Sequence, residues 1–464
     1  MAENVFGKKV GELYGSLCKK EWDPTVTGIL IGLFTLMIMA WWRPWGAVGA
    51  VKNWGDWILY GIGVYSDPDT VVEYLRFTDD EGVAILKKSF WYNTGSVIGI
   101  GFVGGAFLSA CLGGQFALRF PPIKEYVKAV IAGILMGIGA TFAGGCNVGG
   151  LYNALGNLSA HGYAMWLGLI FDVLFGLWLL YKEMEYITWG SGGAKTISFP
   201  AAVQGVVGVV VIAAFIWGAY TYANYDGDDF DTYITSLPGI LLISLALGYT
   251  MQRGRWCMVQ GFREPHMTGN ATMAKSVILS ICIVAIGAAV LKYGVPIRAD
   301  GEPVLAPVNY VRGTFGWGGV MGGFLFGLGA MLAGGCGTGT LWRVGEGQIK
   351  LWLVMIVFGV SVSLCSFWVK VMEFEVSGTA LRDLIPQARL GLINYDVEEI
   401  NEAIAAGESI SITGMEQAGY IGRYVYLPDV MGYGLTLALI LGSMAIWYLI
   451  VTWNEESNKL ILPM

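Results

Sequence analysis

Long apolar stretches recur along the whole chain, separated by short polar turns and by two longer polar segments. A bilayer core needs about 20 apolar residues per helical span, and about ten stretches approach that length. The predicted spans are 25–42, 91–111, 126–143, 162–181, 201–221, 237–251, 270–291, 316–333, 349–371 and 429–452. The pattern therefore predicts an all-α polytopic membrane protein.

The polar segments divide the chain into predicted regions. In chain order these are a cytoplasmic interfacial segment at 1–24, an extra transmembrane helix at 25–43, an extracytoplasmic segment at 44–90, a first transmembrane half at 91–222, a second half at 237–372, an extracytoplasmic insertion at 373–427, and a last helix with a cytoplasmic tail at 428–464. Within the insertion, Val397, Ile400 and Ile404 recur at helical spacing, so they predict a helix that buries one apolar face.

Composition and charge exclude the soluble classes of protein. Only 14% of the residues are charged and 55% are hydrophobic, with a mean hydropathy of +0.58, whereas soluble domains carry about 25% charged residues. The net charge of −7 gives no basic surface for a nucleic acid.

Basic residues of the short loops gather on one side of the predicted membrane. With the N terminus in the cytoplasm, that side carries Arg119, Lys124, Lys128, Lys182, Lys195, Arg253, Arg255, Arg263, Arg343 and Lys350. The acidic loop "YDGDDFD" then lies outside. The charge pattern predicts that both termini are cytoplasmic.

An internal repeat is the most informative feature. Aligning Met136–Tyr152 with Phe326–Trp342 gives nine identities in seventeen positions, including the whole of "AGGC". The helices before the two copies are the third and eighth spans, so the copies enter the membrane from opposite faces. Inverted repeats with a site where they meet are typical of transporters.

Each copy of the repeat breaks a helix at membrane depth, which is tolerated only where protein or a polar cavity satisfies the backbone. If a short helix restarts after each break, its free N–H groups and positive dipole end attract anions. A thiol adds a soft contact or, beside positive charge, a nucleophile. The candidate site residues here are Gly145, Cys146, Asn147, Gly335, Cys336, Thr338 and Thr340.

Further candidates lie outside the repeat. Cys257 stands among Arg253, Arg255 and Arg263 just beyond a span, Cys111 holds a similar place in the first half, and Arg343 follows the second motif. Asp172 is an intramembrane acid, a candidate proton carrier or arginine partner. We interpret His161 and His266 as satisfied interfacial residues, and Cys18, Cys282 and Cys365 as packing residues.

Several other chemistries lack a pattern. The seven cysteines are scattered with no C-x-x-C, and there are two histidines, so we expect neither a metal nor a cofactor. No nucleotide-binding G-x-x-x-x-G-K-[ST] motif occurs, so transport would be passive, ion-coupled or driven by consumption of the substrate.

The two "AGGC" motifs, together with "RGRWCMVQGFRE", resemble the YeeE/YedE sulfur-transport family of prokaryotic inner-membrane proteins. The resemblance spans about 95–370 and the last helix. It implies an hourglass-shaped helical protein in which glycine-cysteine loops are buried at the centre and cysteines relay thiosulfate or a related sulfur or selenium anion. Carried over, it points to Cys146 and Cys336, then to Cys257 and Cys111, and it admits a cytoplasmic sulfur-carrier protein as partner. The first span and the two long outer segments depart from the family pattern.

We therefore predict a transporter, not an enzyme, for a small sulfur-containing anion that Arg255, Arg263 and Arg343 draw inward. Two alternatives stay open. One is a membrane-bound sulfurtransferase in which Cys336 or Cys257 carries a persulfide. The other is a structural membrane subunit that docks a partner through the outer segments.

Overall fold

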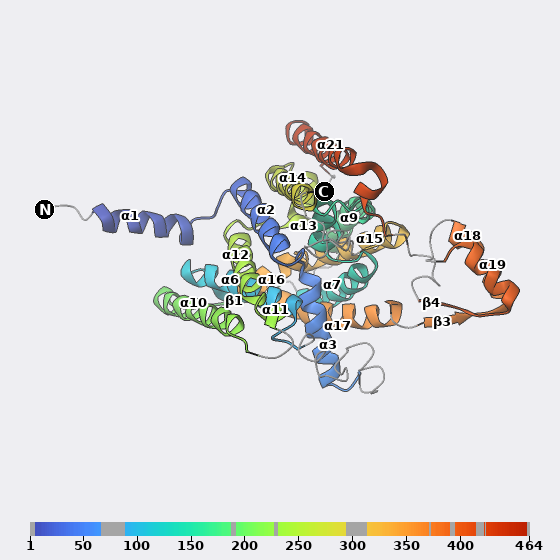
Figure 1. The fold of residues 1–464 in the computed structure, drawn as a ribbon. Coiled ribbons are helices and arrows are strands. Elements are labelled where there is room, and N and C mark those ends of the chain that lie inside the picture. The colour runs from blue at the N-terminus through green and yellow to red at the C-terminus, as the bar shows by residue number, and fades with distance from the viewer. Residues whose placement is uncertain are drawn as a thin grey trace.

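The computed structural model describes residues 5–65, 89–186, 192–226, 231–293, 313–370, 373–389, 395–413, 422 and 424–461. Helices make up most of this part of the chain (Figure 1), and its strands form two short antiparallel pairs. Nine of the described helical segments are long and apolar enough to cross a membrane. The predicted all-α polytopic fold is confirmed.

The helices and strands fall into three groups by length and position. The long helices are α2 (Pro24–Trp41), α6 (Thr94–Leu112), α7 (Ile123–Phe142), α9 (His161–Tyr186), α10 (Ala201–Ala223), α12 (Leu237–Arg253), α14 (Thr272–Tyr293), α15 (Trp317–Ala333), α17 (Ile349–Lys370) and α21 (Leu427–Ser457). Shorter helices inside the bundle are α3 (Ala47–Gly61), η3 (Asn147–Tyr152), α8 (Asn153–Gly156), α13 (Met258–Met267) and α16 (Gly337–Gly345). Peripheral elements are α1 (Val5–Tyr14), η1 (Gly15–Lys19), β1 (Ala117–Phe120), β2 (Lys195–Ser198), α11 (Asp231–Ile234), β3 (Glu373–Val376), η4 (Gly378–Leu384), α18 (Ile385–Arg389), α19 (Val397–Ala406) and β4 (Ile410–Thr413).

Glycines let the long helices approach backbone to backbone. Helices α7 and α15 run antiparallel, because Gly139 packs against Gly322 and Phe326 whereas Gly329 packs against Met136. A Cβ on Gly329 would lie 2.8 Å from the backbone N of Met136, closer than real Cβ contacts. The two helices that precede the repeated motifs therefore cross the bundle in opposite directions and share one glycine-lined contact.

The start of α2 and the end of α21 both meet the start of α14. Ser276 Oγ donates to the carbonyl of Pro24 at 2.5 Å, at the start of α2. Lys275 Nζ pairs with Glu455 at 2.5 Å, near the end of α21. We call this side of the bundle the terminal face.

The opposite side holds the end of α2 and the beginnings of α12 and α21. Trp41 Nε1 donates to the carbonyl of Ser236 at 2.8 Å, and Lys292, at the end of α14, lies 4.8 Å from the ring centroid of Tyr426. We call this side the cap face, because the lobe that follows α17 extends from it (Figure 1).

Helix α3 lies inside the bundle, although its sequence was assigned to an outer segment at 44–90. Val51 and Leu59 are 1% and 2% exposed, and Gly55 meets the backbone of Gly359 on α17. The two charged residues that give this stretch its polar pattern form an ion pair within α3, with Lys52 Nζ 3.0 Å from Asp56 Oδ2. Residues 66–88 of that segment lie outside the described part of the chain.

Within the predicted insertion at 373–427, the described residues 373–389 and 395–413 form a lobe with its own small core. Ile400 is fully buried, Val397 and Ile404 pack against the same cluster, and Val369 at the end of α17 joins it. Strands β3 and β4 pair antiparallel with Val376 opposite Ile410. The expected burial of one apolar face of the helix is confirmed, and we call residues 373–413 the cap.

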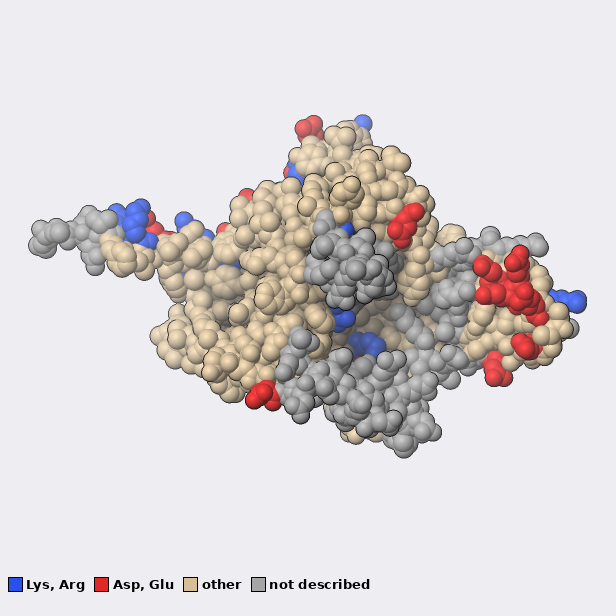
Figure 2. All heavy atoms as spheres, viewed as in Figure 1, with Lys and Arg blue, Asp and Glu red and all other residues tan. Residues whose placement is uncertain are grey.

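Helix α1 extends from the bundle on the side opposite the cap (Figure 1). Its apolar residues Phe6 and Leu13 are 78% and 59% exposed. Figure 2 shows Lys and Arg gathered at α1, acidic residues over the cap, and a mostly uncharged surface between them. Asp23 is the N-cap of α2, and its pKa is held below its usual value because the backbone N–H groups of Thr25 and Val26 donate to its carboxylate.

Candidate functional site

Three membrane helices, α7, α12 and α15, end in turns of the same shape, and each turn leads to a buried cysteine. The residue two positions before the cysteine has positive φ in all three turns: Gly144 at 70°, Arg255 at 50° and Gly334 at 81°. The next residue donates its N–H to the carbonyl five positions back at 3.0 Å. This is how a left-handed residue closes a helix end. The chain reverses there and re-enters the bundle.

Each cysteine then stands at the N-cap of a short helix. Cys146 precedes η3, which continues into α8, Cys257 precedes α13, and Cys336 precedes α16. The first N–H groups of a helix have no intrahelical partner, and the helix dipole puts partial positive charge at the same end. Helix N termini of this kind are ready-made anion sites.

A fourth short helix, α3, brings its N terminus to the same place. A Cβ built on Gly337 would lie 3.0 Å from Cβ of Cys146 and 3.4 Å from Cβ of Ala47, the first residue of α3. A Cβ built on Gly339 would lie 3.2 Å from Sγ of Cys257. Four helix N termini, from segments far apart in the sequence, therefore meet at one buried point.

The three thiols lie in the interior of the bundle at this point. Cys146 and Cys336 are 0% exposed and Cys257 is 2% exposed. The Sγ atoms of Cys257 and Cys336 are 4.0 Å apart. Cys336 Sγ also lies 3.3 Å from Thr338 Oγ1 and accepts the N–H of Gly339 at 3.4 Å. We call Cys146, Cys257 and Cys336 the thiol centre.

Space and unused polar groups adjoin the thiol centre. Gly149 is buried, yet a Cβ on it would meet no atom within 4 Å. The side-chain amide of Asn147 is fully buried, and neither its oxygen nor its nitrogen has a hydrogen-bond partner among the described residues. The Thr340 hydroxyl is also buried and has no hydrogen-bond partner among the described residues. Buried polar groups are nearly always hydrogen-bonded, so these groups are available to a bound ligand.

Two predicted arginines surround one indole on the terminal-face side of the thiol centre. The guanidinium carbons of Arg343 and Arg255 lie 4.8 Å and 5.7 Å from the ring centroid of Trp342. Arg343 also donates to the carbonyl of Gly334, in the turn before Cys336. The second motif therefore carries its own cation, which holds the turn and faces the indole.

Glu346, which sequence reasoning missed, is the partner of Arg255. Its carboxylate is fully buried and ion-paired with Arg255 and, at 3.5 Å, with Arg119. Gln252 donates to it at 2.8 Å and Gln348 at 3.2 Å. The available signal was the lone acid four residues after Trp342, in a stretch that also carries Arg343 and Lys350.

Other predicted site residues lie elsewhere or act through the backbone. Cys111 lies near the end of α6, where a Cβ on Gly208 of α10 would be 3.7 Å from its Cβ, apart from the thiol centre. Gly145 and Gly335 form the turns before the cysteines. Arg263 is half-buried on α13, and its Nε has no hydrogen-bond partner among the described residues.

The remaining titratable candidates do not reach the thiol centre. His161 Nδ1 lies 2.7 Å from Ser159 Oγ, and His266 Nδ1 lies 3.1 Å from the carbonyl of Leu460. Asp172 is 3% exposed, packs against Gly327, and has one carboxylate oxygen without a hydrogen-bond partner in the part of the chain described. Within that part, no group of three or more His, Cys, Asp and Glu side chains is placed to hold a metal ion.

A polar cavity of about 330 Å³ opens beside the N terminus of α3. Its lining includes Arg43, Gly46, Lys52, Asn53 and Asn93. Gly46 is the N-cap of α3, whose first residue borders the thiol centre. The cavity therefore places basic and amide side chains next to one of the four converging helix ends.

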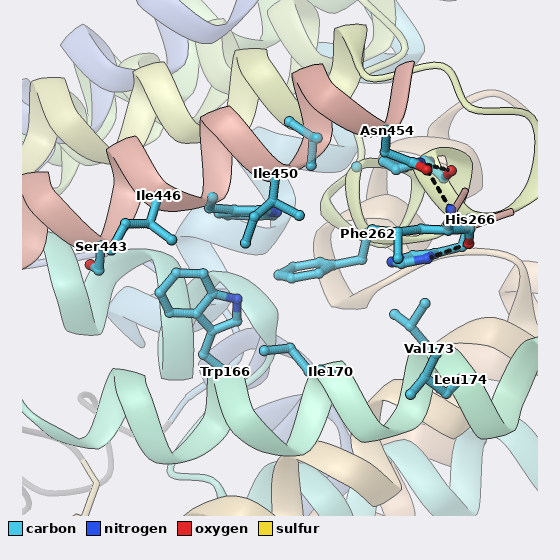
Figure 3. Close-up of a pocket in the computed structure, with 15 residues that line it drawn as sticks. Trp166, Ile170, Val173, Leu174, Phe262, His266, Ser443, Ile446, Ile450 and Asn454 are labelled. Atoms are coloured by element: carbon cyan, nitrogen blue, oxygen red, sulfur yellow. Dashed lines mark hydrogen bonds between the residues drawn. The ribbon is translucent and has the colours of Figure 1, made fainter. Parts of the chain in front are cut away.

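A larger groove, of about 490 Å³, lies between α9, α13 and α21. Figure 3 shows Trp166, Ile170 and Ile450 along its length, with His266 and Asn454 at one end. Its lining contains no cysteine and no arginine. An apolar groove between membrane helices suits hydrocarbon rather than an anion.

Comparison with known proteins matches both repeated motifs to one family. A family model described as "Sulphur transport" matches residues 3–179 and 253–390. The probable transporter YedE of Escherichia coli (strain K12) is 27% identical over 337 residues, covering 70% of this chain and 76% of that protein. YedE of Salmonella typhimurium is 28% identical over 333 residues, with the same two shares. The thiosulfate transporter TsuA of Escherichia coli (strain K12) is 37% identical over 120 residues, covering 25% of this chain and 31% of TsuA.

Proposed function

Because the chain belongs to the Sulphur transport family, we propose that it carries a small sulfur-containing anion, thiosulfate, across the membrane through the thiol centre. The names of its relatives describe transporters, one of them for thiosulfate. This makes the chain a transporter rather than an enzyme.

One observation carries the proposal: three cysteines from distant segments share one buried point with four helix N termini. Thiosulfate has a soft terminal sulfur at one end and three anionic oxygens at the other. Thiols are soft, polarizable contacts for the sulfur, and helix N–H groups are donors for the oxygens. The unpartnered amide of Asn147 and hydroxyl of Thr340 supply further donors. The proposed site therefore fits both ends of the anion.

The proposed route crosses the bundle from the cap face to the terminal face. The anion is first held in the polar cavity near Arg43, passes the N terminus of α3, and reaches Cys146. It is then transferred to Cys257 and Cys336. The antiparallel packing of α7 and α15 supports an inverted repeat, in which the two repeated motifs contribute Cys146 and Cys336.

We infer from the basic residues of the short loops that the terminal face is cytoplasmic. The bacterial relatives support the inner membrane of a prokaryote as its location. Moving two negative charges into a cell that is negative inside costs about 4.6 kcal/mol per 100 mV, at ~2.3 kcal/mol per charge. Uptake then requires an ion gradient or removal of the anion by a cytoplasmic sulfur-carrier protein.

Uptake of radiolabelled thiosulfate into liposomes that contain the purified protein tests the proposal. We expect saturable uptake that unlabelled thiosulfate competes strongly and sulfate competes weakly, because sulfate lacks the soft sulfur. Equal competition by sulfate would remove the role of the thiols in selectivity, and no uptake above empty liposomes would refute transport. Mass spectrometry after turnover separates a relay from a sulfurtransferase, since only the latter leaves an added sulfur on Cys336 or Cys257.

A further inference from the structure

Glu346 sits at the terminal-face end of α16, the helix that begins at the thiol centre. Its carboxylate contacts Arg255 Nη1 through one oxygen and lies 3.5 Å from Arg119 Nη1 through the other. The carboxylate is 0% exposed, whereas the two arginine side chains are 35% and 37% exposed. Among the described side chains, the carboxylate of Glu346 is therefore the negative group that neutralises both arginines.

The two copies of the repeat differ at this position. Continuing the alignment of the motifs pairs Arg343 with Asn153 and Glu346 with Gly156. The first half thus carries the neutral residues Asn153 and Gly156 where the second half carries the charged residues Arg343 and Glu346. Shared packing needs do not explain a charge present in one copy and absent from the other.

The ionic network also contributes too little stability to be explained by packing alone. A buried ion pair adds little net stability, and Arg255 adopts a left-handed backbone, with φ of 50°, that is unfavourable for an L residue. The equivalent residue in the other two turns is glycine, Gly144 or Gly334. The chain accepts strain to place a guanidinium two residues before Cys257.

We propose that Glu346 is an internal counter-ion that the transported anion displaces from Arg255. This inference rests on the proposed function. Arg255 contacts Glu346 through Nη1, so an oxyanion that pairs bidentately with the guanidinium through Nη1 takes the donor that Glu346 uses. With the site empty, Glu346 holds Arg255; when an anion leaves the Cys257–Cys336 pair, it competes for the same fork. Glu346 therefore weakens binding at the terminal face and so promotes release there.

Binding of thiosulfate to the purified full-length protein, measured by calorimetry, tests the inference. Glu346→Gln keeps the size and the hydrogen-bonding capacity but removes the charge, so Kd should fall about tenfold, with KM and maximal uptake rate falling together because release slows. A residue of merely structural importance would not tighten binding. Glu125→Gln is the matched control, because Glu125 pairs with Lys350 and Lys128 at the start of α7; its Kd should not change.

A charge-balanced variant keeps the test valid if Glu346→Gln does not fold. Glu346→Gln combined with Arg119→Gln frees Arg255 without changing the net charge, and it should also tighten binding. If wild type binds thiosulfate and the folded variants bind it equally or more weakly, the counter-ion role is overturned and the proposed function stands. If wild type binds no thiosulfate, the proposed function fails, and this inference fails with it.

Discussion

Gly334 and Arg255 occupy the same place in two different turns: each lies two residues before a buried cysteine, and each has positive φ. Glycine adopts this conformation at no steric cost, whereas arginine does not. The side chain of Arg255 must therefore make interactions that offset the strain. Its guanidinium makes an ion pair with Glu346 and lies over the ring of Trp342.

Arg255→Gly separates the backbone of this turn from its side chain. The substitution relieves about 1–2 kcal/mol of strain and removes one of the two cations on Glu346. Because these effects oppose each other, we expect a small change in the thermal midpoint of the detergent-purified protein. Thiosulfate uptake should nevertheless show a severalfold higher KM, most clearly at low salt, where lost charge matters most.

Gly334→Ala is the converse control. A Cβ on Gly334 would meet no atom within 4 Å, so the cost is backbone strain alone, about 1–2 kcal/mol. The thermal midpoint should fall while KM stays near that of wild type. An unchanged midpoint would mean that the left-handed conformation at this turn is not maintained in the membrane.

The thiols of the thiol centre should each be required for uptake. Cys146→Ser, Cys257→Ser and Cys336→Ser conserve approximate size and lose the soft sulfur, so each should lower the maximal rate by about tenfold or more, equivalent to ~1.4 kcal/mol. The readout is initial uptake rate at matched amounts of folded protein.

Cys282→Ser and Cys365→Ser are the controls for these variants and should transport like wild type. Cys111→Ser should join them, because Cys111 packs toward α10. Transport at the wild-type rate by all three thiol-centre variants would reduce the repeated cysteine to a packing residue.

Two equivalent glycines test where the anion passes. A Cβ on Gly149 meets open space, whereas a Cβ on Gly339 would lie 3.2 Å and 3.4 Å from the sulfurs of Cys257 and Cys336. Gly149→Ala should leave folding intact and narrow the space, raising KM. Gly339→Ala should displace the two thiols and lower the maximal rate instead.

Gly205→Ala provides the reference, since its Cβ also meets nothing within 4 Å but lies on α10, away from the thiol centre. Its uptake should match wild type. If Gly149→Ala is equally silent, the space beside that residue is not part of the route.

The sequence predicted the thiol centre better than it predicted its surroundings. Two copies of Gly-Gly-Cys, with glycine before the thiol, encode a turn followed by an N-cap, and the structure has that geometry at Cys146 and Cys336. In "SACLGGQF" the glycines follow Cys111 instead. The helix therefore continues through Cys111, and its thiol stays on a helix face.

Helix α3 and Glu346 were not predictable from local pattern, for one physical reason. Both carry charge that is neutralised only in three dimensions: Lys52 by Asp56 within α3, and Glu346 by Arg255 and Arg119 from other segments. A hydropathy pattern counts such residues as polar and places them outside the membrane. Their burial depends on partners that the linear sequence does not identify.

The contact between α3 and α17 offers a test of whether α3 belongs to the bundle. A Cβ on Gly55 would overlap the carbonyl of Gly359, whereas a Cβ on Gly61, in the same helix, meets nothing within 4 Å. Overpacking of this kind costs about 1–3 kcal/mol, so Gly55→Ala should lower the thermal midpoint and Gly61→Ala should not. Equal midpoints for the two variants would place α3 outside the packed bundle.

The cap should be removable without loss of the transport site. Val376 and Ile410 face each other across the β3–β4 pair, so replacing residues 377–409 by Asn-Gly joins the strands in register through a tight hairpin turn. The cap core touches the bundle through Val369, Cys365 and Phe142, at the ends of α17 and α7, and is otherwise distinct from the main core, so membrane insertion and most of the thermal stability of the bundle should be retained. We expect the cap to change access, and therefore KM or selectivity among sulfur anions, more than the maximal rate.

A point substitution distinguishes loss of the fold of the cap from loss of its surface. Ile400→Asp puts a charge into the fully buried centre of the cap and should reproduce the effect of the excision, because an unpaired buried carboxylate is far too costly to accommodate. Glu402→Ala, on the exposed side of the same helix, should leave uptake unchanged if the folded shape of the cap is what matters. If instead Glu402→Ala alone alters selectivity, the acidic surface of the cap acts directly on approaching anions. If the excised protein fails to insert, residues 377–409 are part of the core that folds in the membrane, and the cap is not an independent lobe.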